Sequence, residues 1–243
     1  MLTNFGKYLL FIQSLLSRGE APKILFNRTI DEAILIGINS IVIVAIVSTF
    51  IGAVTCVQIS YNLTNALIPR STIGFMVREM TLLELAPTIT SIVLAGKVGS
   101  NIAGGLGTMK ITEQVDALEV MGINSASYLV LPKIMAAVFV FPMLVIIAMF
   151  LSIGGGFVAG ALSGEITPQE YITGIRGDFV PYNILFALIK SVVFAYLISS
   201  ISSFQGYKTE GGALEVGEAS TKAVTNSVIA ILIADFVLAQ LLL

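Results

Sequence analysis

Several charged residues stand inside long apolar stretches of this 243-residue chain, where an ionised side chain needs a partner or a function. Glu84 lies near the start of one stretch, Lys190 lies inside another, and Asp235 lies near the end of the last. A charge in a bilayer is costly, so such residues usually pair with one another or mark a path for ions or substrates. The pattern indicates either a structural ion pair between Lys190 and Asp235 or a proton relay.

Other chemistry is restricted by what the chain lacks. With no histidine and one cysteine, Cys56, it cannot assemble the usual zinc ligand sets, a Cys-His or Ser-His nucleophile, or a disulfide framework. It has no G-x-x-x-x-G-K-[ST] loop, because Gly96-Lys97 lacks the upstream glycine and the following hydroxyl residue. We therefore expect a non-catalytic chain that binds no metal or cofactor, and any energy for transport must come from elsewhere.

Composition places these residues in a membrane protein. Hydrophobic residues make up 56% of the chain and charged residues only 12%, about half the usual charged fraction. The net charge of -2 and the lack of a basic run argue against nucleic acid as a partner. The sequence therefore predicts an all-α integral membrane protein.

The elements that position the charged residues are five predicted spans, because about 20 apolar residues cross a bilayer core of about 30 Å. They cover about 34–60, 80–106, 134–162, 181–204 and 223–242, within a transmembrane domain of residues 31–243. Lys190 and Asp235 then lie about eight and about seven residues from the same membrane face, both about 10 to 12 Å deep. This shared depth supports an ion pair.

Residues 1–30 form a separate N-terminal segment. Apolar residues recur at helical spacing from Leu2 to Leu16, which predicts an amphipathic helix lying in the membrane surface. A soluble helix packed on a core is the alternative. With the N-terminus cytoplasmic, nine lysines and arginines fall on the inner side and three on the outer side, as the positive-inside rule favours. Five spans then place the C-terminus outside.

A short amphipathic helix is predicted between spans two and three. Its apolar side holds Ile111, Val115, Leu118 and Met121, and its acidic side holds Glu113, Asp116 and Glu119. Thr112 is placed to cap the start and Gly122 to end the helix. The acidic side suits a groove on a soluble partner, although the helix could also simply shield the ends of the spans.

Small residues recur at every fourth position in two spans. Ala95, Gly99, Ala103 and Gly107 form such a stripe in span two, and Ser152, Gly156, Gly160 and Gly164 form another in span three. Small residues let helix backbones approach closely. The stripes are compatible with static packing inside the chain and with an interface that slides during transport.

The block from Glu84 to Lys133 contains ELAP at 84–87, AGKVGS at 95–100, LGTMKITEQ at 106–114, DALEVMG at 116–122 and LPK at 131–133. Further runs are KSVVF at 190–194, GY at 206–207 and DFVL at 235–238. With these motifs the sequence resembles the MlaE (YrbE) permease family of ABC-type lipid transporters, and the resemblance covers most of the chain.

This resemblance implies a homodimeric permease of the bacterial inner membrane, with its N-terminus cytoplasmic and its C-terminus periplasmic. Members work with a cytoplasmic ATPase, which uses ATP, and with periplasmic MCE-domain proteins, and they move phospholipids or related lipids between the inner and outer membranes. Thr108 to Gly122 would be the coupling helix on the ATPase, with Glu113, Asp116, Glu119, Met121 and Gly122 as contact candidates.

The resemblance also places Glu84 and its neighbour Leu85 at a lipid cavity between the two subunits, although Glu84 could instead mark only the interfacial end of its helix. Members often carry arginine before this glutamate and glycine after the leucine, whereas this chain has Leu83 and Ala86. The cavity is therefore expected to be less cationic. Helical spacing adds a predicted acyl-chain track at the end of span one, formed by Val57, Ser60, Leu63 and Leu67, with Tyr61 near headgroup level.

Two other classes of function remain open. An ion-coupled secondary transporter or channel would use Lys190, Asp235 and Glu84 as an ion path and would need no ATPase. A purely structural membrane subunit would use the small-residue stripes for assembly alone. Neither accounts for the acidic amphipathic helix followed by Leu131-Pro132-Lys133.

Overall fold

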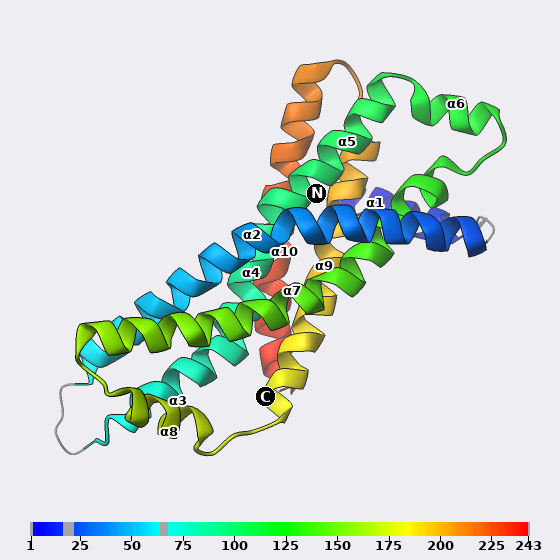
Figure 1. The fold of residues 1–243 in the computed structure, drawn as a ribbon. Helices are drawn as coiled ribbons and strands as arrows, with labels where there is room; N and C mark the ends of the chain where they lie inside the picture. Colours follow the sequence, from blue (N-terminus) through cyan, green and yellow to red (C-terminus); the bar gives the residue numbers. More distant parts are fainter. Residues whose placement is uncertain (1, 17–21, 64–67, 243) are drawn as a thin grey trace.

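The computed structural model describes residues 2–16, 22–63 and 68–242, and these residues contain helices and no strand (Figure 1). Five helices in this part are long and apolar enough to cross a membrane. They are α2 (Pro22–Asn62), the continuous run from α3 to α5 (Ser71–Ile111), α7 (Ser125–Ser163), α9 (Tyr182–Tyr207) and α10 (Ala213–Leu242). The predicted all-α membrane fold is confirmed.

Three of these helices are much longer than the predicted spans. They contain 39 to 41 residues, which is about 60 Å at 1.5 Å per residue and roughly twice the thickness of a bilayer core. They must therefore tilt strongly or extend beyond the hydrocarbon. α2 and α7 run side by side, while α9 and α10 form a second pair that crosses them (Figure 1).

Glycines set the close packing of α2 against α7. A Cβ added to Gly52 would lie 1.8 Å from the backbone oxygen of Ser152, and one added to Gly155 would lie 2.1 Å from the backbone oxygen of Thr49. No side chain fits at these two positions, because the facing atoms belong to a helix backbone. These small residues therefore serve contacts inside the chain, and Gly160 of span three faces the side chains of Ile166 and Cys56.

The stripe of small residues in span two packs mainly against α9 and the start of α10. Ala95 and Ala103 are fully buried, and a Cβ on Gly206 of α9 would lie 2.5 Å from the backbone oxygen of Ala103. Gly99 faces Ser202, and Gly107 faces Val216. The described contacts of this stripe thus lie within the chain. They agree with the first of the two alternatives, static packing between helices of the same chain.

Span two is not a uniform α-helix. α3 (Ser71–Met80) continues into the π-helical segment η1 (Thr81–Ile89), then α4 (Thr90–Leu94), a second π-helical segment η2 (Ala95–Gly99) and α5 (Ser100–Ile111). Pro87 contributes to the first widening because it has no N–H to donate to the preceding turn. Such wide turns occur frequently at functional sites. The two charged residues Glu84 and Lys97 each lie in a π-helical segment.

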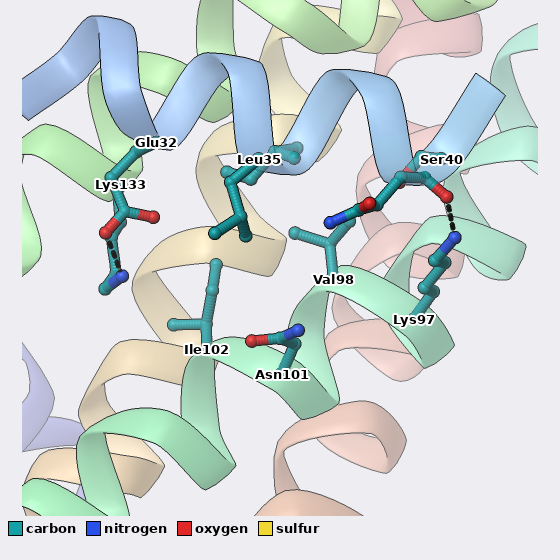
Figure 2. A pocket seen from close by; sticks show the side chains of 10 residues that line it. Glu32, Leu35, Ser40, Lys97, Val98, Asn101, Ile102 and Lys133 are labelled. Atoms are coloured by element: carbon teal, nitrogen blue, oxygen red, sulfur yellow. Dashed lines mark hydrogen bonds and ion pairs between the residues drawn. The ribbon is translucent and has the colours of Figure 1, made fainter.

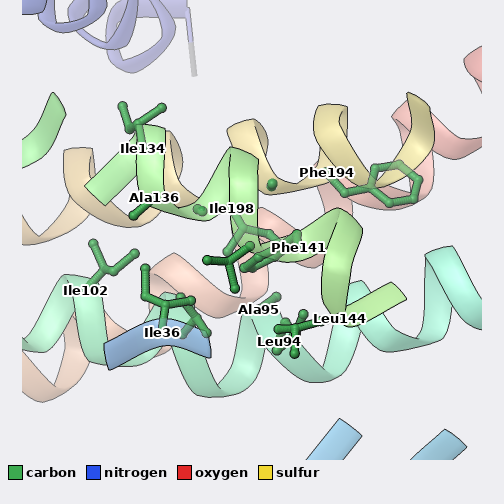
Figure 3. Close-up of a cluster of buried hydrophobic side chains, with 14 of the residues drawn as sticks. Ile36, Leu94, Ala95, Ile102, Ile134, Ala136, Phe141, Leu144, Phe194 and Ile198 are labelled. Atoms are coloured by element: carbon green, nitrogen blue, oxygen red, sulfur yellow. The ribbon is translucent and has the colours of Figure 1, made fainter. Parts of the chain in front are cut away.

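The hydrophobic core joins all of these elements. Figure 3 shows Phe141 of α7 beside Ile198 of α9, and Leu144 of α7 beside Leu94 of α4; Phe194 of α9 belongs to the same cluster. Ile36 of α2 and Ile102 of α5 belong to the same buried cluster. A second, smaller cluster lies around Cys56, Ile73, Val77, Ile166 and Tyr171.

The N-terminal helix α1 (Leu2–Leu16) packs on the bundle with one side and exposes apolar residues on another. On one side Phe11 and Leu15 are buried, and the hydroxyls of Tyr8 and Ser200 of α9 are 2.8 Å apart. On the other side Leu9 and Leu10 are 52% and 66% exposed. Helix α1 is therefore packed on the bundle while it keeps an apolar face open, as a helix at a membrane surface requires.

A short helix, α8 (Pro168–Arg176), packs on α3 at the end of the molecule where α7 finishes (Figure 1). Its start is held by a capping box in which Thr167 and Glu170 bond each other's backbone N–H. The Thr167 hydroxyl and the Thr167 backbone N–H both donate to the Glu170 carboxylate, and these two hydrogen bonds lower the pKa of this exposed carboxyl. Its end is held by Arg78 of α3, which donates to the backbone oxygens of Ile175, Gly177 and Asp178.

Candidate functional site

The three intramembrane charges meet at one place, contributed by three different spans. Lys190 of α9 is fully buried, and its Nζ donates to Glu84 Oε2 at 2.9 Å and to the Leu83 backbone oxygen at 3.0 Å. The same Nζ forms an ion pair with Asp235 Oδ1 of α10. Because Lys190 has no exposed surface, all its hydrogen bonds must come from the protein, and this arrangement supplies three acceptors.

Polar and aromatic neighbours complete this charged cluster, which consists of Glu84, Lys190 and Asp235. Thr88 Oγ1 donates to Asp235 Oδ1 at 3.1 Å. The Phe186 ring lies 5.0 Å from Lys190 Nζ, a distance at which a cation and an aromatic ring attract each other. Two carboxylates against one ammonium leave the cluster negatively charged when all three groups are ionised.

The side chain of Glu84 is 51% exposed, whereas that of Asp235 is only 15% exposed. The cluster is therefore buried on one side and open on the other, and Glu84 is the member that a ligand can reach. Leu85, which follows it, is half-buried and Ala86 is buried.

The structure changes the expected position of Glu84. The sequence suggested that span two begins near residue 80, with Glu84 at its end. The helix instead begins at Ser71, so Glu84 lies thirteen residues along it, about 20 Å from its start. The charge of Arg78 had made residues 71–80 look like a loop, but the carbonyls at the end of α8 satisfy that charge.

The predicted short cytoplasmic helix is α6 (Gln114–Val120), and its start differs from the prediction. Thr112 does not cap it, because its Oγ1 donates back to the Thr108 backbone oxygen at 2.8 Å. Glu113 takes the N-cap position with a left-handed φ of 60°. The helix ends at Val120, and Gly122 in the turn that follows has a φ of 80°, a backbone conformation that glycine adopts without strain.

The acidic side of α6 is partly used inside the chain. Asp116 pairs with Lys110 at 2.6 Å, and Glu119 Oε1 accepts from Ser125 Oγ at 2.7 Å and from Tyr207 OH at 2.9 Å. Glu113 is exposed and no described side chain pairs with it. The surface that α6 offers a partner is therefore Glu113 together with apolar side chains.

Those apolar side chains lie at the end of α6. Val115 is buried as expected, but Met121, which was placed on the same apolar side, is 66% exposed. Val120 beside it is 89% exposed. The helix stops at Val120, so the periodicity that would turn Met121 inward is broken at Gly122.

The predicted acyl-chain track is divided by the fold. Val57 and Tyr61 are 47% and 82% exposed, but Ser60 is buried with its Oγ bonded to the Cys56 backbone oxygen. Leu63 packs against the smaller hydrophobic cluster, because α3 and α8 cover that face of α2. Leu67 lies outside the described residues. Val57 therefore borders an apolar surface hollow with Ala53, Val54 and Ala159, rather than a track shared with Ser60 and Leu63.

Sequence reasoning missed two polar groupings. Arg78, Glu79 and Asn183 form a chain in which Arg78 Nε donates to Glu79 Oε1 at 2.9 Å and Asn183 donates to Glu79 Oε2 at 2.6 Å. Tyr207 bonds Glu119 and also stacks near Phe11 of α1, with ring centroids 5.4 Å apart. The Arg78-Glu79 dipeptide ahead of an apolar run was the available signal for the first grouping, and no local pattern marked the second.

The fold and this cluster define a multi-pass helical membrane protein with a charged site shared by three spans. The family described as Permease MlaE matches residues 29–241. A probable ABC transporter permease of Rickettsia bellii is 35% identical over 98% of this chain and 92% of its own length. A probable ABC transporter permease of Synechocystis is 33% identical over 89% of this chain and 82% of its own length.

A plant protein is also similar. The Arabidopsis thaliana protein named TRIGALACTOSYLDIACYLGLYCEROL 1, chloroplastic, is 35% identical over 90% of this chain and 62% of its own length. This chain belongs to the MlaE permease family. It is an ABC transporter permease, and its five apolar helices make it a multi-pass membrane protein.

Proposed function

We propose that this chain is the permease subunit of a lipid transporter that moves phospholipids or related lipids between the inner and outer membranes of a bacterium. The observation that carries the proposal is the charged cluster, in which a half-exposed Glu84 is held by the buried Lys190 inside an otherwise apolar bundle. A lipid needs this combination of an apolar wall and a polar contact. The plant relative's name includes a diacylglycerol lipid, which supports the same class of substrate.

The proposed assembly contains two copies of this chain. Of the five long helices, α10 is the least buried inside the chain: 11% of the residues in its apolar stretch are buried. The next least buried is α2, with 22%. Ile233 and Phe236 of α10 are 62% and 68% exposed close to Asp235. A second copy packed along α10 would enclose the open side of the charged cluster and form a lipid cavity between the subunits.

The energy source in this proposal is a separate cytoplasmic ATPase that binds and hydrolyses ATP, while this chain binds no cofactor. The surface of α6 with Glu113, Val120 and Met121 would seat on it. A periplasmic MCE-domain protein would receive the lipid at the end of the molecule that carries α8. The N-terminus is then cytoplasmic and the C-terminus periplasmic.

Lipid transfer in a reconstituted system tests the proposal. Purification in mild detergent should recover the ATPase and the MCE-domain protein with this chain, and proteoliposomes of the complex should move a fluorescent phospholipid when ATP is added. The Glu84→Gln variant should abolish transfer without loss of the complex. Transfer that ignores ATP would contradict the proposal.

A second candidate function is ion-coupled transport through the charged cluster. It is favoured by one observation, the burial of Lys190 between two carboxylates of different spans, which is the arrangement of a proton relay. Imposing a pH gradient across the same proteoliposomes without ATP separates the two functions. Uptake driven by the gradient alone would favour the ion-coupled transporter.

A further inference from the structure

A second polar site lies on the same long helix as the charged cluster, but about 20 Å further along it, thirteen residues from Glu84. It is a cavity of about 30 Å³ between α2 and the η2–α5 segment. Figure 2 shows Glu32 and Lys133 at one end, Lys97 and Ser40 at the other, and Leu35, Val98 and Ile102 between them.

The cations at the two ends differ in how they are neutralised. Lys133 pairs with Glu32, which is the one carboxylate that lines the cavity in the described part of the chain. Lys97 donates only to the backbone oxygen of Asn39 and has no carboxylate partner among the described residues. A carbonyl dipole leaves the lysine's charge uncompensated, so this end of the cavity carries a net positive charge in an apolar setting.

Other polar groups also line the cavity near Lys97. Ser40 is 1% exposed and its hydroxyl makes no hydrogen bond. The side-chain amides of Asn39 and Asn101, which line the same cavity, belong to exposed residues and are open to a ligand. Buried polar groups are normally bonded, so the unbonded hydroxyl of the buried Ser40 is the unusual feature here. An ammonium, a hydroxyl and two amides that converge on one cavity are the donors that an oxyanion with several acceptor oxygens would satisfy.

The outside of the cavity is apolar. Ile34, Ile38 and Val42 of α2 are 52%, 63% and 66% exposed and are spaced four residues apart. They form one continuous stripe that adjoins Leu35, a lining residue. The cavity is too small for a whole lipid, so a lipid bound here would enter it only with its phosphate oxygens, and its acyl chains would lie outside along this stripe.

We infer that this cavity binds the phosphate group of a phospholipid from the membrane leaflet on the α6 side. The inference rests on the proposed lipid transport and adds a second contact point, distinct from the charged cluster. A lipid held here would lie beside the same helix that carries Glu84, so the site is placed to load the transporter. The π-helical segment η2 carries Lys97 at the cavity, as η1 carries Glu84 at the charged cluster.

Lipid binding by the purified chain tests this inference without the ATPase. Native mass spectrometry in detergent would follow the binding of palmitoyl-oleoyl phosphatidylglycerol, with a diacylglycerol of the same chains as the control that lacks phosphate. We expect the wild type to retain phosphatidylglycerol and not diacylglycerol. Lys97→Gln should weaken phosphatidylglycerol binding about tenfold, since a charged hydrogen bond contributes about 1.5–3 kcal/mol.

Matched variants separate the site from general attraction to anionic lipid. Lys97→Arg keeps the cation and should bind nearly as the wild type does, and Asn101→Leu should weaken binding without a change of charge. Lys23→Gln removes an exposed lysine outside the cavity and should leave binding unchanged. Equal losses in Lys97→Gln and Lys23→Gln would overturn the inference. Thermal unfolding of each variant shows that it is folded.

Inorganic phosphate distinguishes the two sources of this chemistry. If millimolar phosphate protects the wild type but not Lys97→Gln against thermal unfolding, and displaces the lipid, the site takes a free anion and the inference about lipid is wrong. If binding is independent of Lys97 while Glu84→Gln still abolishes transfer, this inference fails and the proposed function stands. If binding depends on Lys97 but the complex transfers no lipid, the proposed function fails and the site remains.

Discussion

Arg78 and Lys190 are both fully buried cations in the described part of the chain, at 2% and 0% side-chain exposure, but they are satisfied in different ways. Arg78 donates to three backbone oxygens at the end of α8 and to Glu79. Lys190 bonds two carboxylates and one backbone oxygen. Backbone carbonyls cannot change their charge or move far, whereas a half-exposed carboxylate can do both.

The difference distinguishes two kinds of site. Arg78 with its four acceptors is a fixed clamp, and the charged cluster is a site that can adapt to a ligand. The planar guanidinium of Arg78 offers several fixed donors, so it holds α8 on α3 in one arrangement. Lys190 holds Glu84 at a surface that a ligand can reach. The contrast teaches that burial of a charge does not by itself indicate function, and that the exposure of its partner is the more informative quantity.

Removing the clamp should have the largest effect on stability. In Arg78→Met the three carbonyls and Glu79 lose their donor, and we expect the free energy of unfolding to fall by about 3–5 kcal/mol. Arg70→Met is the matched control, because Arg70 and Glu165 are 58% and 59% exposed and such pairs contribute about 0–1 kcal/mol. Denaturant unfolding in detergent measures both, and equal losses would contradict the role given to Arg78.

Breaking the charged cluster should cause the next largest loss of stability. Lys190→Met leaves the largely buried Asp235 unpaired, and we expect a loss of about 3 kcal/mol. The double variant Lys190→Met with Asp235→Asn removes both charges and should recover most of this loss. The same unfolding assay applies; strictly additive losses would show that the two residues do not form a stabilising pair.

Glu79 contacts Arg78 and Glu84 contacts Lys190, so variants of the two glutamates test the comparison between the clamp and the charged cluster. Glu79→Gln weakens the clamp and should lower stability by about 1–3 kcal/mol, because its side chain is 19% exposed. Glu84→Gln should change stability by less than about 1 kcal/mol, because its side chain is 51% exposed. Lipid transfer should show the reverse order, with a loss of about tenfold or more in Glu84→Gln only. A parallel loss of stability and transfer in both variants would remove the distinction.

The smallest effect on stability is expected at α6. Glu113→Lys reverses an exposed charge that no described side chain pairs with, so unfolding should change by less than about 0.5 kcal/mol. Recovery of the ATPase with the permease should fall several-fold. Glu165→Lys, an exposed charge at the α8 end, serves as the control. Unchanged recovery in Glu113→Lys would refute the coupling role.

Much of the fold follows from local sequence. Apolar runs of more than 20 residues predict the spans, and each of the five predicted spans falls within one of the five long helices to within one residue. The helix ends were harder to predict, because residues 71–80 carry charges whose partners lie about 100 residues away. Likewise, the periodicity of α6 predicted its apolar and acidic sides but not the partners of Asp116 and Glu119.

The candidate site was only partly predictable. Membrane depth suggested that Lys190 and Asp235 share a level, but it gave no reason to add Glu84, since the angular position of a helix about its own axis is set by packing. The same applies to Val57, Ser60 and Leu63, which share helical spacing but not exposure. Periodicity reports which residues share a helix face, and it does not report what covers that face.

The sequence by itself determined the class of structure and the residue types available for chemistry, because hydropathy and composition act locally along the chain. It also determined that the chain carries no G-x-x-x-x-G-K-[ST] phosphate-binding loop. Only the tertiary structure decided which charges meet, which glycines allow backbone contact and that Lys97 finds no carboxylate among the described residues. Those outcomes depend on how the helices tilt and pack, and packing joins residues that lie far apart in the sequence.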